Sequence, residues 1–105
     1  MSNSKRLEQL LDMLNKNSDS FILFAIAKEY EKAADQVLAI EYYKRLLNEF
    51  PNYVGTYYHF GKLLEKKGET DEAIETYSKG MSIARAAGDQ HSLSELAEAK
   101  LNLED

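Results

Sequence analysis

The chain lacks cysteine and tryptophan, and its 105 residues include one proline and five glycines. Without cysteine, disulfides, thiolate zinc sites and cysteine nucleophiles are excluded. Few prolines and glycines favour long helices over a fold built from turns and short strands. The two histidines, His59 and His91, are far apart and neither has a second histidine at i+4, so they form no metal-binding pattern. We expect neither a metal nor a cofactor.

An excess of positive charge and long apolar runs are also missing. The formal net charge is −5, which argues against a sequence-independent nucleic-acid binder, because such proteins carry a basic surface. Near the N-terminus the leucines are interrupted by Lys5, Arg6 and Glu8, which suits neither a signal peptide nor a membrane span. We therefore expect no nucleic-acid partner, no membrane association and a cytoplasmic location.

Apolar residues recur at helical spacing along nearly the whole chain; for example, leucines at positions 7, 10, 11 and 14 form one stripe. Residues typical of helix ends separate these segments. Asp35 suits an N-cap, and Pro51 cannot continue a helix. Gly68 and Gly88 suit left-handed C-caps. The sequence predicts helices with antiparallel neighbours over about residues 4–15, 20–33, 36–50, 53–67, 71–87 and 90–103.

The chain repeats itself when shifted by 34 residues. Ala27 and Gly61 coincide in this alignment, and both must be small if the two helices of one hairpin cross closely there. The identical pairs are Lys28/Lys62, Glu31/Glu65, Lys32/Lys66, Ala39/Ala73, Ile40/Ile74, Glu41/Glu75 and Tyr43/Tyr77.

Two sets of residues at fixed spacing define the repeat. They are Leu23, Ile26, Ala27, Tyr30, Ala39, Tyr43 and Pro51 in the first unit and Tyr57, Phe60, Gly61, Leu64, Ala73 and Tyr77 in the second. This pattern resembles the tetratricopeptide repeat. It departs from the family in lacking tryptophan, in carrying Ala34 in place of the usual turn glycine, and in carrying Arg85 in place of the second proline.

The resemblance implies an all-α fold, a right-handed α-solenoid of two tetratricopeptide helix hairpins. We expect one domain over residues 1–105. Its parts are an N-terminal helix (4–16), repeat 1 (20–53), repeat 2 (54–87) and a C-terminal capping helix (89–104).

Family members commonly line a concave groove with the first helix of each hairpin. By this resemblance the chain is expected to be a protein–protein interaction scaffold that binds a peptide segment of a partner, and not an enzyme. The expected groove residues are Phe21, Phe24, Lys28, Glu31 and Lys32 in repeat 1 and Tyr58, His59, Lys62, Glu65 and Lys66 in repeat 2.

Two interpretations of this surface remain open. The aromatic and lysine residues fit a peptide with an apolar anchor and an acidic group. Alternatively, Phe21 and Phe24 are covered by the N-terminal helix, and the lysines and glutamates pair with each other on a solvated face. For the chain as a whole, a homodimer or larger homo-oligomeric structural module is the second hypothesis. A small-ligand-binding protein or an enzyme is a remote third.

Overall fold

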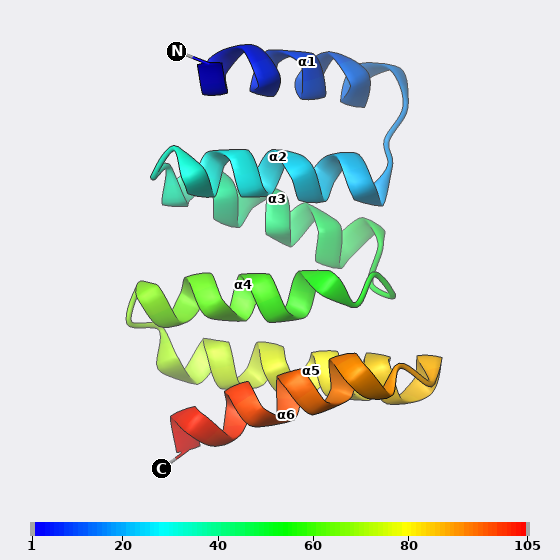
Figure 1. Ribbon diagram of the computed structural model, residues 1–105, viewed down its shortest axis with the longest axis vertical. Helices are drawn as coiled ribbons and strands as arrows, with labels where there is room; N and C mark the ends of the chain where they lie inside the picture. Colours follow the sequence, from blue (N-terminus) through cyan, green and yellow to red (C-terminus); the bar gives the residue numbers. More distant parts are fainter. Residues whose placement is uncertain (1, 105) are drawn as a thin grey trace. The chain divides into compact units, whose positions relative to one another are not determined.

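The computed structural model describes residues 2–104, with side chains from residue 5 onward, and these residues form six α-helices and no strand. The predicted helices are confirmed, with ends that differ by at most about two residues. They are α1 (Ser2–Lys16), α2 (Ser20–Lys32), α3 (Gln36–Glu49), α4 (Gly55–Lys66), α5 (Thr70–Ala87) and α6 (Gln90–Glu104) (Figure 1).

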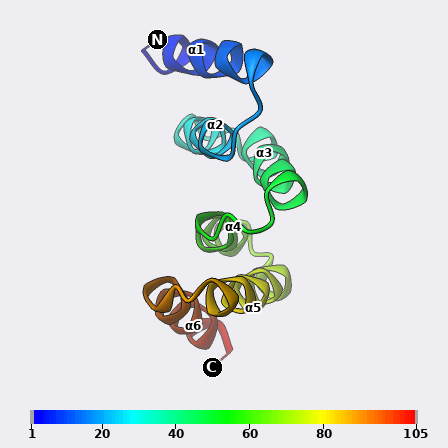
Figure 2. The same cartoon turned by 90° about the vertical axis from the view of Figure 1, so that its right-hand side faces the viewer.

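The helices form two compact units, with the boundary between Tyr53 and Val54. In the first unit, α2 packs against both α1 and α3 (Figure 2). In the second unit, α5 packs against both α4 and α6, and α6 also contacts α4. The predicted right-handed superhelix and single domain concern both units together, and they stay predictions.

Aspartates cap three of the helices at their N-termini. The Asp19 carboxylate accepts a 2.7 Å hydrogen bond from the Phe21 backbone N–H at the start of α2. Asp35 accepts from the Leu38 backbone N–H at 3.2 Å, as predicted, at the start of α3. At the start of α6, the Asp89 carboxylate accepts hydrogen bonds from the backbone N–H and from the hydroxyl of Ser92, and both bonds lower the pKa of Asp89. Each carboxylate satisfies a backbone donor that has no partner within the helix.

Left-handed residues end three of the helices. Gly68 and Gly88 have φ angles of 81° and 71°, which confirms the predicted C-caps of α4 and α5. In the first repeat, Ala34 occupies the position of Gly68 and has a φ angle of 63°. An alanine in this conformation is strained, because its Cβ approaches the following carbonyl oxygen. The first hairpin therefore turns in the same way as the second but with a less suitable residue.

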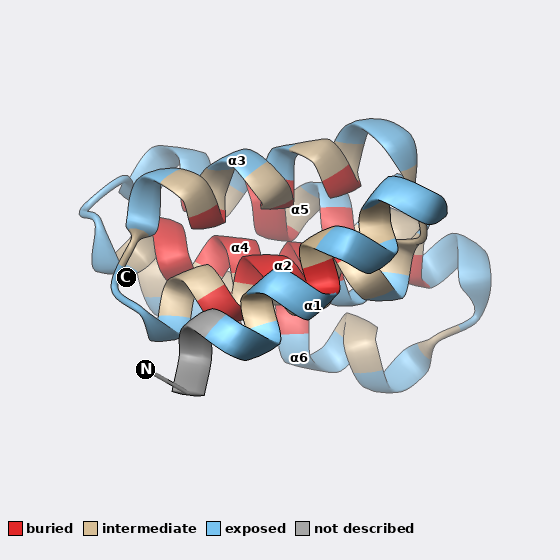
Figure 3. Cartoon of the chain, turned by 90° about the horizontal axis from the view of Figure 1, so that it is seen from above, coloured by how far each residue is buried: buried red, intermediate tan, exposed pale blue. Residues whose placement is uncertain are grey.

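Each of α2 to α5 contributes several buried residues to the core, whereas the described side chains of α1 are mostly exposed (Figure 3). In the second hairpin, a Cβ atom added to Gly61 would overlap the Tyr77 ring, and one added to Gly80 would lie 2.5 Å from Tyr57 Cβ. Both added atoms would lie far inside van der Waals contact, so α4 and α5 cross as closely as the small residue at position 61 predicts.

Candidate functional site

A lysine, a glutamate and a tyrosine form the same contacts in both hairpins. In the first, Lys28 Nζ lies 3.6 Å from Glu31 Oε1 on α2, and the Tyr43 hydroxyl of α3 donates a 2.6 Å hydrogen bond to that oxygen. Each glutamate therefore joins a lysine one turn earlier to a tyrosine on the next helix.

The second hairpin repeats this arrangement. Lys62 Nζ lies 3.7 Å from Glu65 Oε2 on α4, and the Tyr77 hydroxyl of α5 donates a hydrogen bond to the same oxygen. Because the three residues recur at the 34-residue shift, the repeat places equivalent chemistry on α2 and on α4.

The tyrosines are buried and the lysines face solvent. Tyr43 and Tyr77 are fully buried. The pKa of both tyrosines is raised well above the ordinary value. Burial is the largest cause, and the hydrogen bond to the glutamate is the second. They therefore act as neutral hydrogen-bond donors. The side chains of Lys28 and Lys62 are 40% and 42% exposed, so both ammonium groups remain accessible to a partner.

Aromatic rings lie beside these ion pairs. Phe24 is half-buried, with its ring centroid 6.3 Å from that of Tyr43 and 5.7 Å from that of Tyr53. Phe21, one turn earlier, is 65% exposed. The alternative in which the N-terminal helix covers both phenylalanines is therefore wrong for Phe21.

On α4, the half-buried Tyr58 occupies the position that corresponds to Phe24 on α2. Its ring centroid lies 6.4 Å from that of Tyr77, and Lys62 Nζ lies 5.5 Å from the Tyr58 centroid. The half-buried His59 ring packs edge-on against Tyr58 at 5.6 Å. Lys66 is exposed. The structure thus brings together Tyr58, Lys62 and Glu65 in the second unit. In the first unit Phe24 packs against Tyr43, whose hydroxyl binds Glu31, the partner of Lys28.

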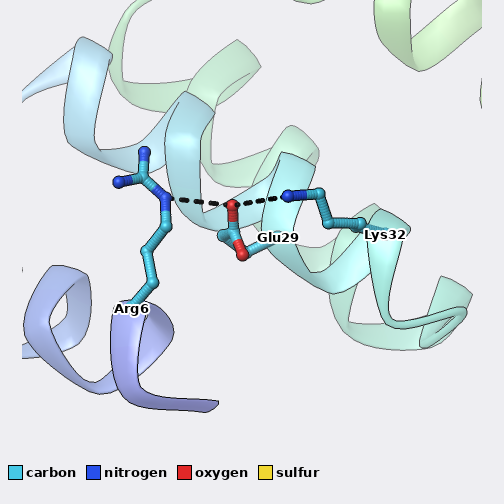
Figure 4. A network of polar contacts seen from close by, with 3 residues as sticks. All are labelled: Arg6, Glu29 and Lys32. Atoms are coloured by element: carbon cyan, nitrogen blue, oxygen red, sulfur yellow. Dashed lines mark hydrogen bonds and ion pairs between the residues drawn. The ribbon is translucent and has the colours of Figure 1, made fainter. Parts of the chain in front are cut away.

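Lys32 belongs to a different cluster from Lys28. Its Nζ lies 3.8 Å from Glu29 Oε2, and the Arg6 Nε of α1 donates to the same oxygen at 3.1 Å (Figure 4). The Glu29 side chain is only 8% exposed, and its other oxygen, Oε1, has no hydrogen-bond partner among the described residues. Lys32 is therefore paired with Glu29, to which Arg6 of α1 also donates, whereas the ion pair of Glu31 is with Lys28.

Glu29 was missed in the sequence analysis, although the sequence carries a signal for it. The 34-residue shift places Glu29 on Leu63, which is 1% exposed. A charge at a core position of the repeat indicates a special partner, and that partner is Arg6, 23 residues away in the chain.

The last helix adds a second wall to the α4 surface. A pocket of about 100 Å³ opens between α4 and α6. Its lining residues are Tyr58, Lys62, Glu95, Glu98, Ala99 and Asn102. The helix predicted as a C-terminal cap therefore also contributes three polar side chains, Glu95, Glu98 and Asn102, to this surface.

A larger concavity of about 370 Å³ lies where α3 ends, around Phe50 and Pro51. Glu49 is the only charged residue among those that line it. Its carboxylate already accepts from Ser18 at 3.0 Å and from Arg45 at 3.2 Å. The concavity therefore offers little unsatisfied chemistry to a ligand.

Over the described side chains, no three histidine or acidic residues are grouped so that they could hold a metal ion. Within that same part of the chain, no helix is long and apolar enough to cross a membrane.

Known proteins show the same repeat. Family profiles described as "Tetratricopeptide repeat" match residues 22–53 and 54–86. A solution structure of a tetratricopeptide repeat domain protein from Salinibacter ruber is 45% identical, with a TM-score of 0.81, over 83% of this chain and 88% of that chain. The chain belongs to the tetratricopeptide repeat family. The resemblance and the all-α helical-repeat fold class are therefore confirmed.

Two further structures are similar to this tetratricopeptide repeat chain. A crystal structure of the Salinibacter ruber domain has a TM-score of 0.78 and 45% identity, over 83% of this chain and 97% of that chain. A solution structure of a protein from Bordetella parapertussis has a TM-score of 0.79 and 25% identity, over 93% of this chain and 86% of that chain. No curated protein matches the chain. Tetratricopeptide repeats generally mediate protein–protein interaction, and the family is generally non-enzymatic.

Proposed function

We propose that the chain is a protein-interaction scaffold that binds a peptide segment of a partner through the first helix of a hairpin, α2 in the first unit or α4 in the second. One observation carries the proposal: an aromatic ring, an accessible ammonium group and a fixed carboxylate occur together on the first helix of each hairpin. These sets are Phe24, Lys28 and Glu31 on α2 and Tyr58, Lys62 and Glu65 on α4.

The buried tyrosines support this proposal because they hold the surface charges in place before a partner arrives. Tyr43 fixes the Glu31 carboxylate, which in turn orients Lys28. A charged group that is already ordered loses less conformational entropy on binding than a freely rotating one. The half-buried aromatic ring beside each pair supplies apolar area of the kind that dominates binding energies.

A pull-down tests the proposal. The bait is the chain itself, and the test variant is the double substitution Lys28→Gln and Lys62→Gln. The control variant is Lys44→Gln and Lys79→Gln, which removes the same charge from exposed positions on the second helices, α3 and α5. Lysate from the cells that produce the chain supplies candidate partners, and the binding segment of each captured protein is then titrated as a synthetic peptide.

We expect the parent chain and the control variant to bind the same peptide with similar affinity. The Lys28→Gln and Lys62→Gln variant should bind it more weakly, by about threefold or more, since each exposed charge contact contributes up to about 1 kcal/mol. Equal binding by both variants, with both still folded by circular dichroism, would remove α2 and α4 as the binding surface.

Self-association is a second candidate function, favoured by exposed apolar side chains. Phe21 on α2 and Leu101 on α6 are 65% and 62% exposed. Such residues suit an interface between copies of the chain. Light scattering over a range of concentrations tests this: a mass that rises above 12.0 kDa supports a homodimer, and a constant 12.0 kDa removes it. The cytoplasmic location also remains a proposal, which cell fractionation tests.

A further inference from the structure

Helix α6 repeats the residue pattern found on the first helix of each hairpin. In all three helices, a large residue is followed three positions later by a second large residue and then at once by a small one. These sets are Leu23, Ile26 and Ala27 on α2, Tyr57, Phe60 and Gly61 on α4, and Leu93, Leu96 and Ala97 on α6. Helix α6 therefore has the sequence of a first helix, against which a second helix would pack.

The burial of this pattern differs between the three helices. Ala27 and Gly61 are buried, because each lies under the second helix of its own hairpin. Ala97, at the same place in the pattern, is only half-buried, as is Leu93. Leu101, four positions further on, is 62% exposed. Within residues 5–104, the α6 stripe, which consists of Leu93, Ala97 and Leu101, is thus left partly open.

Helix α1 has the features of a second helix. It packs on α2, the helix that follows it, as α5 packs on α6. Its leucines at positions 7, 10, 11 and 14 have the spacing of Tyr43, Leu46, Leu47 and Phe50 on α3. Tyr43 is fully buried, whereas Leu7 and Leu11 are only half-buried. The α1 stripe, which consists of Leu7, Leu11 and Leu14, is therefore also left partly open.

The contact inside the second hairpin predicts how the two stripes would meet. A Cβ atom added to Gly61 would overlap the Tyr77 ring, so the small residue of the first helix faces the tyrosine of the second. Ala97 corresponds to Gly61 in its pattern, and Leu7 corresponds to the tyrosine in its spacing. A leucine that faces an alanine fills such a crossing with the same alternation of large and small residues.

The charges of the two helices are complementary. Helix α1 carries three basic and two acidic residues, whereas α6 carries one basic and three acidic residues. Opposite net charges attract when two helices approach, and like charges repel. Pairing α1 with α1, or α6 with α6, would bring charges of one sign together. Charge therefore favours a contact between α1 and α6 over a symmetric one.

We propose that the α6 stripe binds the α1 stripe of a second copy of this chain, so that the two helices complete a hairpin at the junction. Different surfaces of the two copies take part, and each copy keeps one open stripe after it has bound another, so association continues beyond a dimer. The proposal rests on self-association, the second candidate function, and is separate from peptide binding by α2 or α4.

The first test uses two variants that each lose one stripe. Ala97→Gln with Leu101→Gln alters α6, and Leu7→Gln with Leu11→Gln alters α1. Light scattering follows the mass at chain concentrations up to about 1 mM. We expect the mass of the parent to rise past twice 12.0 kDa, and each variant alone to associate at least about tenfold more weakly, because apolar side chains are lost from the contact.

An equal mixture of the two variants distinguishes this contact from a symmetric one. One variant supplies an intact α1 stripe and the other an intact α6 stripe, so the mixture should form pairs and stop at twice 12.0 kDa. The control is Val37→Gln, which changes an exposed apolar residue on α3 outside both stripes and should associate as the parent does.

Engineered cysteines give a second measurement, since the chain has no cysteine of its own. Leu7→Cys and Ala97→Cys are mixed under mild oxidation. A disulfide needs Cβ atoms within about 4.5 Å, so we expect crosslinked pairs in the mixture and few in either variant alone. The control mixture is Glu8→Cys with Ala97→Cys, because Glu8 is exposed on α1 and lies outside its stripe; it should crosslink less.

Several outcomes would overturn the proposal. If either glutamine variant associates as strongly as the parent, or if their mixture stays at 12.0 kDa, the contact between α1 and α6 is wrong. Crosslinking of each cysteine variant with itself as readily as in the mixture would indicate a symmetric interface instead. If circular dichroism shows that a glutamine variant has lost helix, the cysteine pair decides. A parent that stays at 12.0 kDa without crosslinks would remove self-association, whereas the pull-down tests the peptide surface separately.

Discussion

The Tyr43 hydroxyl on α3 donates a 2.6 Å hydrogen bond to the Glu31 carboxylate on α2, and the ring that carries this hydroxyl is fully buried. One side chain therefore fills the core of the hairpin and also holds a charged group of the candidate binding surface. Tyr77 and Glu65 repeat this relationship in the second hairpin. Because Tyr43 and Tyr77 both stabilise the hairpins and position the surface carboxylates, substitutions of these tyrosines are expected to change the stability of the fold.

Removing the tyrosine hydroxyls should lower stability with little loss of packing. Tyr43→Phe and Tyr77→Phe each keep the ring and delete a hydrogen bond to a carboxylate. A bond of this kind contributes about 1.5 kcal/mol, which corresponds to a fall of about 6 °C in Tm. Thermal unfolding followed by circular dichroism measures the change. Tyr53→Phe is the control, and a similar loss in that variant would contradict the role of the carboxylate bond.

The same tyrosines should make stability depend on alkaline pH. Burial and the glutamate hydrogen bond raise their pKa above the ordinary value of 10.0. Above that pH the unfolded chain releases the tyrosine protons while the folded chain keeps them, so the free energy of unfolding falls as the pH rises. Below it this contribution is fully present. Urea unfolding at several pH values between about 8 and 11 should show a steeper decline for the parent than for the Tyr43→Phe, Tyr77→Phe double variant; parallel declines would refute the assignment.

Exchanging the residues at the two turns should change stability in opposite directions. Ala34→Gly relieves a left-handed alanine, which is strained by about 1–2 kcal/mol, and adds about 0.5–1 kcal/mol of backbone entropy loss. The expected net effect is a gain of about 0.5 kcal/mol. Gly68→Ala should lose about 1 kcal/mol through conformation alone, because the added Cβ would meet no atom within 4 Å. Chemical denaturation measures both, and a loss on Ala34→Gly would contradict the assignment of strain.

Gly61→Ala should destabilise the second hairpin even though alanine is the better helix former. The new Cβ would overlap the Tyr77 ring, and overpacking of this kind costs about 1–3 kcal/mol. A double-mutant cycle tests the cause. In the Gly61→Ala background, Tyr77→Leu should cost at least about 1 kcal/mol less than in the parent, because the clash is removed. Simple additivity would show that the two residues do not interact.

The Arg6–Glu29 pair should stabilise the contact between α1 and α2. Glu29 is buried while the Arg6 side chain is 61% exposed, so Arg6→Gln is expected to lose about 1–2 kcal/mol, less than a fully buried pair would. Replacing both partners, by Arg6→Met and Glu29→Leu, should restore the stability of the parent or exceed it, since Leu63 fills the equivalent position in repeat 2.

The control for that pair is Lys16→Gln, which breaks an exposed ion pair with Asp12 within α1 and should change stability by less than about 0.5 kcal/mol. A loss on Lys16→Gln as large as that on Arg6→Gln would mean that the burial of Glu29 adds nothing to the pair.

Contacts between residues close in the chain could be predicted from the sequence, and contacts between helices could not. The Lys28–Glu31 and Lys62–Glu65 pairs follow from i, i+3 spacing on one helix, and this pairing is one of the two alternatives that the sequence leaves open. The exposure of Phe21 could not be predicted in this way, because it depends on where α1 lies on α2.

The sequence by itself determined the six helices and the two hairpins. Apolar periodicity, N-caps and left-handed turns depend on residues only a few positions apart. The 34-residue repeat predicts that the two hairpins have the same structure. Only the tertiary structure decided that Arg6 reaches the buried Glu29 and that α6 brings Glu95 and Glu98 to Lys62. These contacts join residues more than 20 positions apart, and their geometry depends on how helices pack, which local spacing does not encode.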